Sequence, residues 1–143
     1  MHRCDGRRHG KVAGMPTSVS VSLGPADFPT RVTARQHEIR ADEPPEKGGS
    51  DTGPEPFELL LASLGACTAI TLRMYARRKG WPLEGVQVEA GFDEEQGQRL
   101  IRMSLSVTGE LSSEQRARLL QIANACPVHK ALTTGVMVET RLD

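Results

Sequence analysis

Aromatic side chains are scarce in this chain of 143 residues. Only five residues, 3% of the total, are aromatic: Phe28, Phe57, Tyr75, Trp81 and Phe92. A core must therefore be built from Leu, Val, Ile, Ala and Met, or be completed by a partner subunit. The length suits one domain and is too short for two comfortable ones.

The chain also lacks an excess charge and a long apolar run. Lys plus Arg equals Asp plus Glu at 18 each, so no global field indicates nucleic acid or an anionic membrane as a partner. The longest uncharged apolar run, residues 59–72, is shorter than the roughly 20 residues that span a bilayer. The basic start leads into glycine and polar residues, unlike a secretory signal. We therefore expect a cytoplasmic protein without nucleic-acid or membrane partners.

Cysteine is rare and odd in number. Three cysteines, Cys4, Cys67 and Cys126, are too few for the disulfide framework of a small secreted protein. Cys4 falls in residues 1–16, which are rich in Gly, Arg and His without periodicity and are predicted to be a flexible extension. The folded domain is expected over residues 17–143, which leaves Cys67 and Cys126 as the cysteines to explain.

Alternating polar and apolar residues predict strands early in the domain. Residues 18–23 alternate with period two, and short strands are plausible at 30–34 and 37–41, which together would form an antiparallel meander. Residues 42–56 then collect four prolines and three glycines, so no regular element is expected there. Long loops in compact domains are often functional.

A long helix is predicted over residues 57–79. Glu58 suits its N-terminal end, the basic residues 77–79 suit its C-terminal end, and Gly80 followed by Pro82 stops it. Because residues 59–72 are apolar or small on nearly every face, we expect a central helix surrounded by protein.

The remaining elements complete an α+β chain. Alternation over 86–92 and 101–107 predicts a β-hairpin, and Ser112 with Gln115 forms a capping-box pattern that begins a second helix ending near residue 125. Pro127 suits the first turn of a short helix through Leu132, and residues 136–142 are predicted as a last strand. The predicted order is βββ-α-ββ-α-β, with sheet around or against a buried helix.

The two cysteines of the domain have different predicted environments. Cys126 lies at a helix start, where the helix dipole and free backbone N–H groups stabilise a thiolate. Cys67 lies in the middle of an apolar helix, which should raise its pKa unless a cation or donor reaches it. Local physics therefore favours Cys126 as the more acidic thiol. Alternatively, both are small buried hydrophobes without a chemical role.

Two cysteine motifs resemble those of a known family. The segment 53–69 reads Gly-Pro-Glu-Pro-Phe-Glu-Leu-Leu-Leu-Ala-Ser-Leu-Gly-Ala-Cys-Thr-Ala, and residues 126–130 read Cys-Pro-Val-His-Lys. Over residues 17–142 the chain resembles the OsmC/Ohr family (osmotically inducible protein C and organic hydroperoxide resistance proteins), and its OsmC-like branch most of all. The resemblance implies an intertwined homodimer with active sites at the subunit interface. It also implies a peroxidase without metal or haem that reduces organic hydroperoxides, and hydrogen peroxide less well, and is recycled by a dithiol, typically a lipoylated protein.

The resemblance assigns roles to both cysteines. Cys67 matches the peroxidatic cysteine and Cys126 the resolving one. A Cys67 sulfenic acid would condense with Cys126 to a disulfide that an external dithiol reduces. The Cα atoms must then approach to about 4.4 to 6.8 Å.

The activating groups are less well matched. In the hydroperoxide-resistance branch a glutamate ten residues before the first cysteine holds an arginine. Phe57 has that offset here, with Glu58 next to it. Nine residues of ideal helix turn through about 900°, so Glu58 should point away from Cys67 and is most simply a helix-start charge, although it is kept as a tentative partner. The arginine would come from the N-terminal meander, where the tentative choice is Arg31 and the other candidates are Arg35 and Arg40.

His129 suggests two further roles. Together with Cys67 and Cys126 it invites a zinc site, but no further ligands with suitable spacing are present, so no metal or other cofactor is predicted. It is either an ordinary helix residue or a hydrogen-bonding group beside Cys126. The leading hypothesis is a dimeric thiol peroxidase. The alternative is a non-enzymatic dimer of the same fold that binds a ligand or senses redox state.

Overall fold

The computed structural model of the chain describes residues 17–142. The predicted extension, residues 1–16 with Cys4, lies outside the described residues. The chain divides into two compact units, one ending at Pro56 and one beginning at Phe57. The mixed helices and antiparallel strands confirm the predicted α+β class. That residues 17–143 act as a single domain stays a prediction.

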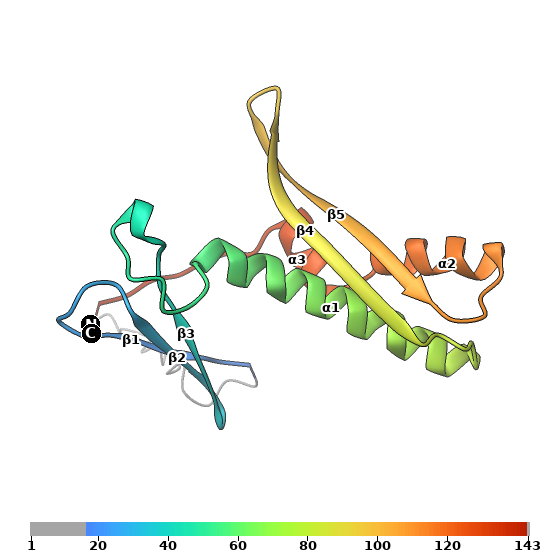
Figure 1. Cartoon of the computed structure of the whole chain (residues 1–143), viewed down its shortest axis with the longest axis horizontal. Coiled ribbons are helices and arrows are strands. Elements are labelled where there is room, and N and C mark those ends of the chain that lie inside the picture. The colour runs from blue at the N-terminus through green and yellow to red at the C-terminus, as the bar shows by residue number, and fades with distance from the viewer. Residues whose placement is uncertain (1–16, 143) are drawn as a thin grey trace, which may run out of the picture. The chain divides into compact units, whose positions relative to one another are not determined.

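The first unit contains the predicted meander. Strands β1 (Ser20–Leu23), β2 (Thr30–Ala34) and β3 (His37–Ala41) pair antiparallel in the order β1-β2-β3 (Figure 1). Val32 of the middle strand pairs with Val21 on one side and Ile39 on the other, so one apolar row crosses the sheet.

The loop after β3 is organised around a buried carboxylate, Asp42. One oxygen accepts hydrogen bonds from the backbone N–H groups of Glu43 (2.7 Å) and Ser50 (3.4 Å). The other accepts from the Thr52 backbone N–H (3.1 Å) and hydroxyl (2.7 Å). Gly49 is required here because a Cβ at this position would lie 1.9 Å from the carbonyl oxygen of Glu43. The loop is therefore ordered, and a 3₁₀ turn at Pro45–Lys47 corrects the expectation that it holds no regular element.

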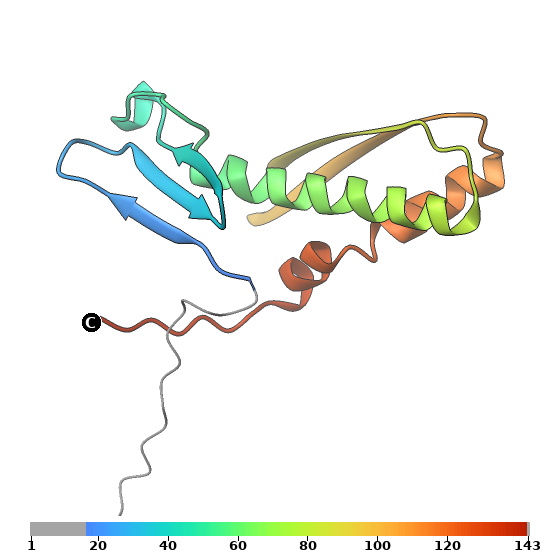
Figure 2. The same ribbon diagram turned by 90° about the horizontal axis from the view of Figure 1, so that it is seen from below.

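The second unit packs a helix against a β-hairpin. Helix α1 (Pro56–Lys79) is followed by β4 (Gly85–Glu95) and β5 (Gln98–Thr108), which pair along their whole length (Figures 1 and 2). Helix α2 (Ser113–Ala123) begins with the predicted capping box, and α3 (Pro127–Thr134) follows a short break. The buried core joins the end of α1 to α2 and consists of Leu72, Tyr75, Ala76, Leu83, Leu119 and Ala123.

Helix α1 is buried on one face only. The row Leu64, Thr68, Leu72 and Ala76 recurs every four residues and is buried, as one stripe of a helix should be. Its other side includes Ile70 and Met74, which are 59% and 65% exposed. The second unit covers one side of the helix only, so the expectation of a helix surrounded by protein, which included a partner subunit, stays a prediction.

By length and composition alone, α1 could also cross a membrane. Core helices of soluble proteins pass the same test. This helix carries a buried stripe that packs on its own hairpin and α2, so its apolar character has a use within the fold.

The predicted last strand is absent from the described residues. Residues 136–142 follow α3 without regular structure, and their apolar side chains Val136, Met137, Val138 and Leu142 are exposed. A strand requires hydrogen bonds from a neighbouring strand, and no edge of the described part of the chain pairs with this segment. The alternating sequence favours an extended conformation but does not supply a partner.

Candidate active site

Cys67 lies on α1 beside the buried stripe of that helix. It directly precedes Thr68, which is fully buried, and it follows Leu64 by three residues. Cys67 is therefore at the border of the stripe and is half-buried. Thr71, four residues later, lies on the same side of the helix, and its hydroxyl acts to lower the pKa of the Cys67 thiol.

Cys126 is the N-terminal capping residue of α3 and is fully buried. Its carbonyl oxygen accepts the first helical hydrogen bond, from the backbone N–H of Lys130 (3.0 Å). Pro127 at the first helical position has no N–H, so the N–H groups of Val128 and His129 are the first available donors. Both N–H groups act to lower the pKa of the Cys126 thiol.

The structure brings Cys67 and Cys126 into direct interaction. Burial raises the pKa of the Cys67 thiol, and the neighbouring Cys126 sulfur raises it further, while the backbone N–H of Val128 and the hydroxyl of Thr71 act in the opposite direction. Neither cysteine forms a disulfide in the structure.

The pKa of Cys126 shifts in the opposite direction to that of Cys67. Burial acts to raise its pKa, but the Cys67 thiol, the backbone N–H of His129 and the hydroxyl of Thr68 together outweigh burial and lower the pKa. These directions agree with the expectation that Cys126 is the more acidic of the two thiols, which stays a prediction.

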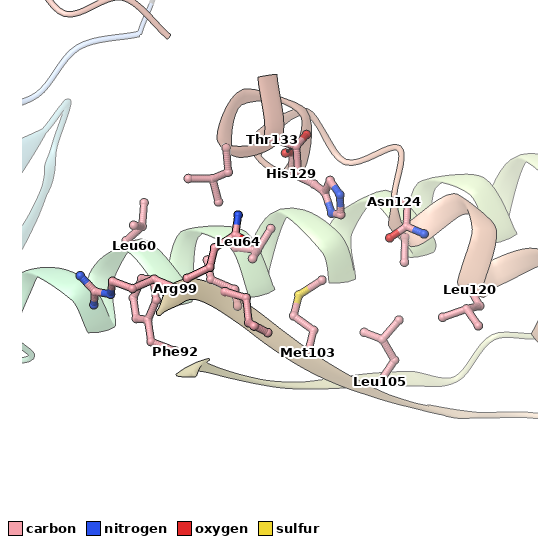
Figure 3. A pocket seen from close by; sticks show the side chains of 15 residues that line it. Leu60, Leu64, Phe92, Arg99, Met103, Leu105, Leu120, Asn124, His129 and Thr133 are labelled. Atoms are coloured by element: carbon pink, nitrogen blue, oxygen red, sulfur yellow. Dashed lines mark hydrogen bonds between the residues drawn. The ribbon is translucent and has the colours of Figure 1, made fainter. Parts of the chain in front are cut away.

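A cleft of about 730 Å³ opens between α1, the hairpin, α2 and α3 (Figure 3). Its walls are mostly aliphatic, and its polar groups include Arg99, Asn124, His129 and Thr133. His129 lies between the cleft and the thiols. Its side chain lines the cleft, and its backbone N–H acts to lower the pKa of Cys126. The cleft is large enough for a small organic molecule.

Thr68 makes a second connection between the cleft and the thiols. Its hydroxyl donates to the carbonyl oxygen of Leu64 (2.9 Å), lies 4.0 Å from the Met103 sulfur and acts on Cys126. Leu64 and Met103 both line the cleft. The cysteine pair therefore lies directly behind the aliphatic wall.

Of the tentative activating residues, Glu58 belongs to the same compact unit as Cys67, and Arg31 belongs to the other unit. Glu58 lies exposed in the first turn of α1, and no carboxylate acts on the Cys67 thiol among residues 17–142. Arg31 lies on β2, where it forms an exposed ion pair with Glu38 (3.6 Å), and Arg40 is its register partner on β3. Arg35 occupies the turn between these strands with a positive φ of 54°. Within residues 57–142, no cation contributes to the pKa shift of Cys67.

Sequence reasoning missed the two threonines of the site. Thr71 follows Cys67 by one helical turn and could have been found from that spacing, whereas the buried position of Thr68 depends on packing against the hairpin. His129 was considered for its ring, but the structure uses its backbone N–H at the thiol. Residues 17–142 contain no group of three His, Cys, Asp or Glu side chains that could hold a metal ion.

Comparison with known proteins fits this arrangement of two cysteines on facing helices. A sequence model of the OsmC-like protein family matches residues 48–141, which include both cysteines. The chain belongs to the OsmC-like family. No curated protein has a matching sequence.

Solved structures share the fold of this OsmC-like chain. An OsmC-like protein from Mycoplasma pneumoniae superposes with a TM-score of 0.68 at 18% identity and covers 82% of this chain and 86% of its own. An organic hydroperoxide resistance protein OsmC from Legionella pneumophila gives 0.61 at 21% identity, with 84% and 90% covered. An organic hydroperoxide resistance protein from Elizabethkingia anophelis gives 0.58 at 20% identity, with 80% and 86% covered. At these identities the likeness shows the fold.

Proposed function

We propose that this OsmC-like chain is a cysteine-based peroxidase that reduces organic hydroperoxides, and hydrogen peroxide less well, to the alcohol or water. The observation that carries the proposal is the interacting pair of free thiols, Cys67 and Cys126, behind an aliphatic cleft. Family membership and the names of two neighbours, organic hydroperoxide resistance proteins, support the same class of reaction.

In the first step, the Cys67 thiolate attacks the terminal oxygen of the hydroperoxide. An S–O bond forms and the O–O bond breaks, so sulfur is oxidised by two electrons. The alkoxide leaves and takes a proton to become the alcohol, which leaves a sulfenic acid on Cys67. The aliphatic walls of the cleft suit the alkyl part of such a substrate.

In the second step, Cys126 resolves the sulfenic acid. Its thiolate attacks the Cys67 sulfur, an S–S bond forms, and hydroxide leaves and is protonated to water. The lowering of the Cys126 pKa suits this step, because the attacking group must be a thiolate. An external dithiol, of the kind that lipoylated proteins carry, then reduces the disulfide and returns both thiols.

The first step needs a cation beside Cys67, because burial and Cys126 raise the pKa of this thiol. We assign this part to an arginine of the N-terminal meander, tentatively Arg31. The comparison of Arg31→Ala with Arg35→Ala and Arg40→Ala identifies the residue: the correct variant raises the pKa of Cys67 and slows peroxide consumption, and the other two do not.

We also propose that the working unit is a homodimer in a reducing, cytoplasmic compartment. The uncovered face of α1, with Ile70 and Met74, and the exposed apolar segment 136–142 are surfaces that a second copy would cover. Sedimentation of the purified chain tests this directly: a dimer supports the proposal, and a monomer at micromolar concentration contradicts it.

The roles of the cysteines are tested by trapping the sulfenic acid. After one equivalent of cumene hydroperoxide, Cys126→Ser should form one cumyl alcohol and a dimedone adduct located on Cys67 by mass spectrometry. Cys67→Ser should form neither. An adduct on Cys126 in the Cys67→Ser protein would show that Cys126 is the peroxidatic cysteine. If neither variant formed the alcohol, the proposed peroxidase activity would be contradicted.

The aliphatic cleft also favours a second candidate, a dimer that binds a ligand or senses redox state without turnover. Such a protein would form the Cys67–Cys126 disulfide with stoichiometric oxidant but would show no sustained rate. Continuous peroxide consumption with dihydrolipoamide or dithiothreitol as reductant separates the two functions.

A further inference from the structure

Arg99 stands apart from the other residues that line the cleft. It lies near the start of β5 and is the only charged side chain among lining residues that are mostly aliphatic. In Figure 3 it lies at one end of the cleft, Leu120 lies at the other end, and His129 lies between them.

Two aromatic rings hold this guanidinium. The central carbon of Arg99 lies 4.7 Å from the ring centroid of Phe57 and 4.8 Å from that of Phe92. The rings themselves are in edge-to-face contact, with centroids 5.1 Å apart. Because the rings lie at 77° to each other, the guanidinium can lie flat on only one of them. No hydrogen bond of its N–H groups is formed within residues 17–142, and such groups can bind a carboxylate with two parallel hydrogen bonds.

No ion pair joins Arg99 to a carboxylate in residues 17–142, although Glu94 is its register partner on β4. The neighbouring Arg102, by contrast, is paired with Asp93 (2.5 Å) and Glu95 (3.6 Å). On the hairpin, Arg102 is therefore paired with acidic residues, whereas Arg99 contacts two aromatic rings at the end of the cleft. An aliphatic cleft with a single cation at its end is complementary to a molecule with an apolar chain and one anionic end.

We propose that Arg99 anchors the carboxylate of a medium- or long-chain carboxylic acid whose alkyl chain lies along the cleft toward His129. Where the occupant is a substrate, this inference rests on the proposed function: the anchored chain would carry its hydroperoxide group past Leu64 and Met103, beside the wall behind which the thiols lie. Arg99 is then a residue that selects among hydroperoxides and takes no part in breaking the O–O bond.

The test measures binding apart from turnover. Decanoate and the uncharged 1-decanol, which differ only in the end group, are titrated calorimetrically into the full-length reduced protein, its Arg99→Ala and Arg99→Glu variants, and the control Arg102→Ala. We expect decanoate to bind about three- to tenfold more tightly than decanol. This preference should vanish in Arg99→Ala, reverse in Arg99→Glu and persist in Arg102→Ala.

Three results would overturn the anchor. They are an unchanged preference in Arg99→Ala, an equal loss in Arg102→Ala, which would indicate a general charge effect, and no decanoate binding at all. Absence of binding in a protein that sediments as a dimer would indicate that a second copy fills the cleft.

Turnover forms an independent arm of the test. With linoleic acid hydroperoxide, Arg99→Ala should raise KM about three- to tenfold and leave kcat within about twofold, whereas both constants for the methyl ester of that hydroperoxide should stay unchanged. If no hydroperoxide is consumed while decanoate still binds through Arg99, the peroxidase proposal fails and the anchor stands. If the hydroperoxide is consumed but Arg99→Ala changes neither KM nor decanoate binding, the anchor fails alone.

Discussion

Cys67 and Cys126 shift each other's pKa in opposite directions. Their interaction raises the pKa of Cys67 and lowers that of Cys126, and the N-terminus of α3 adds backbone N–H groups on the side of Cys126. The interaction therefore favours a thiolate on Cys126 over one on Cys67, and Cys126 is the thiol that the proposed mechanism uses second.

Removing either thiol should change the pKa of the other. Cys126→Ser is expected to lower the pKa of Cys67, because one of the causes that raise it is lost. Cys67→Ser is expected to raise the pKa of Cys126, because its thiol donor is lost. Thiolate absorbance at 240 nm, titrated between pH 5 and 11, measures both values, and unchanged values would show that the thiols do not interact.

The two threonines should divide between the two thiols. Thr68→Val removes a hydroxyl that lowers the pKa of Cys126, and Thr71→Val removes one that lowers the pKa of Cys67. Each nearly isosteric variant should therefore raise the pKa of its own cysteine and leave the other nearly unchanged. Titration of the variants on Cys67→Ser and Cys126→Ser backgrounds assigns each value. The reverse assignment would contradict this division.

Much of this site was foreseeable from local sequence. The capping box at Ser112 and Gln115, the proline after Cys126 and the charged ends of α1 each depend on neighbours along the chain, and each predicted its element correctly. The direction of the Cys126 pKa shift agrees with the same local reasoning in part, since backbone N–H groups of the helix N-terminus contribute to it after the Cys67 thiol.

The remaining features depend on contacts between distant segments. The approach of Cys67 to Cys126 and the buried hydroxyl of Thr68 arise only when α3 and the hairpin pack on α1. The same holds for the missing strand at 136–142 and for the exposed side of α1. Alternation and apolar character predict the conformation or burial that a segment favours. They do not predict whether the same chain supplies the strand or layer that packs against it.

Acid should weaken the loop that Asp42 organises. The Thr52 hydroxyl, opposed by burial and helped by backbone N–H groups, lowers the pKa of Asp42 to about 2. Because the pKa is lower in the folded state, the stabilisation is complete above the unfolded value near 4 and is lost as the pH falls toward 2. Melting temperatures between pH 7 and 2.5 should show a gap between the wild type and Asp42→Asn that narrows below pH 4. Thr52→Val should raise the pKa of folded Asp42, so its acid-induced loss should begin at the same pH as in the wild type but be smaller and end at a higher pH. A gap between the wild type and Asp42→Asn that does not vary with pH would contradict this account.

Leu72 and Ile70 provide a matched comparison on α1. Leu72 is fully buried in the core, so Leu72→Ala should lower the free energy of unfolding by about 2 to 5 kcal/mol. Ile70→Ala removes an exposed side chain and should cost much less within the chain, but it should weaken the proposed dimer. Urea unfolding at several protein concentrations separates these effects. Equal losses that do not vary with concentration would contradict both the burial difference and the dimer.

The central claim is tested most directly by steady-state consumption of cumene hydroperoxide with dihydrolipoamide as reductant, measured for the wild type, Cys67→Ser, Cys126→Ser and, as a control outside the pair, Cys4→Ser. The account predicts sustained turnover by the wild type and Cys4→Ser, no consumption by Cys67→Ser, and loss of disulfide-dependent recycling in Cys126→Ser. Full turnover by Cys67→Ser, or no turnover by the wild type, would contradict it.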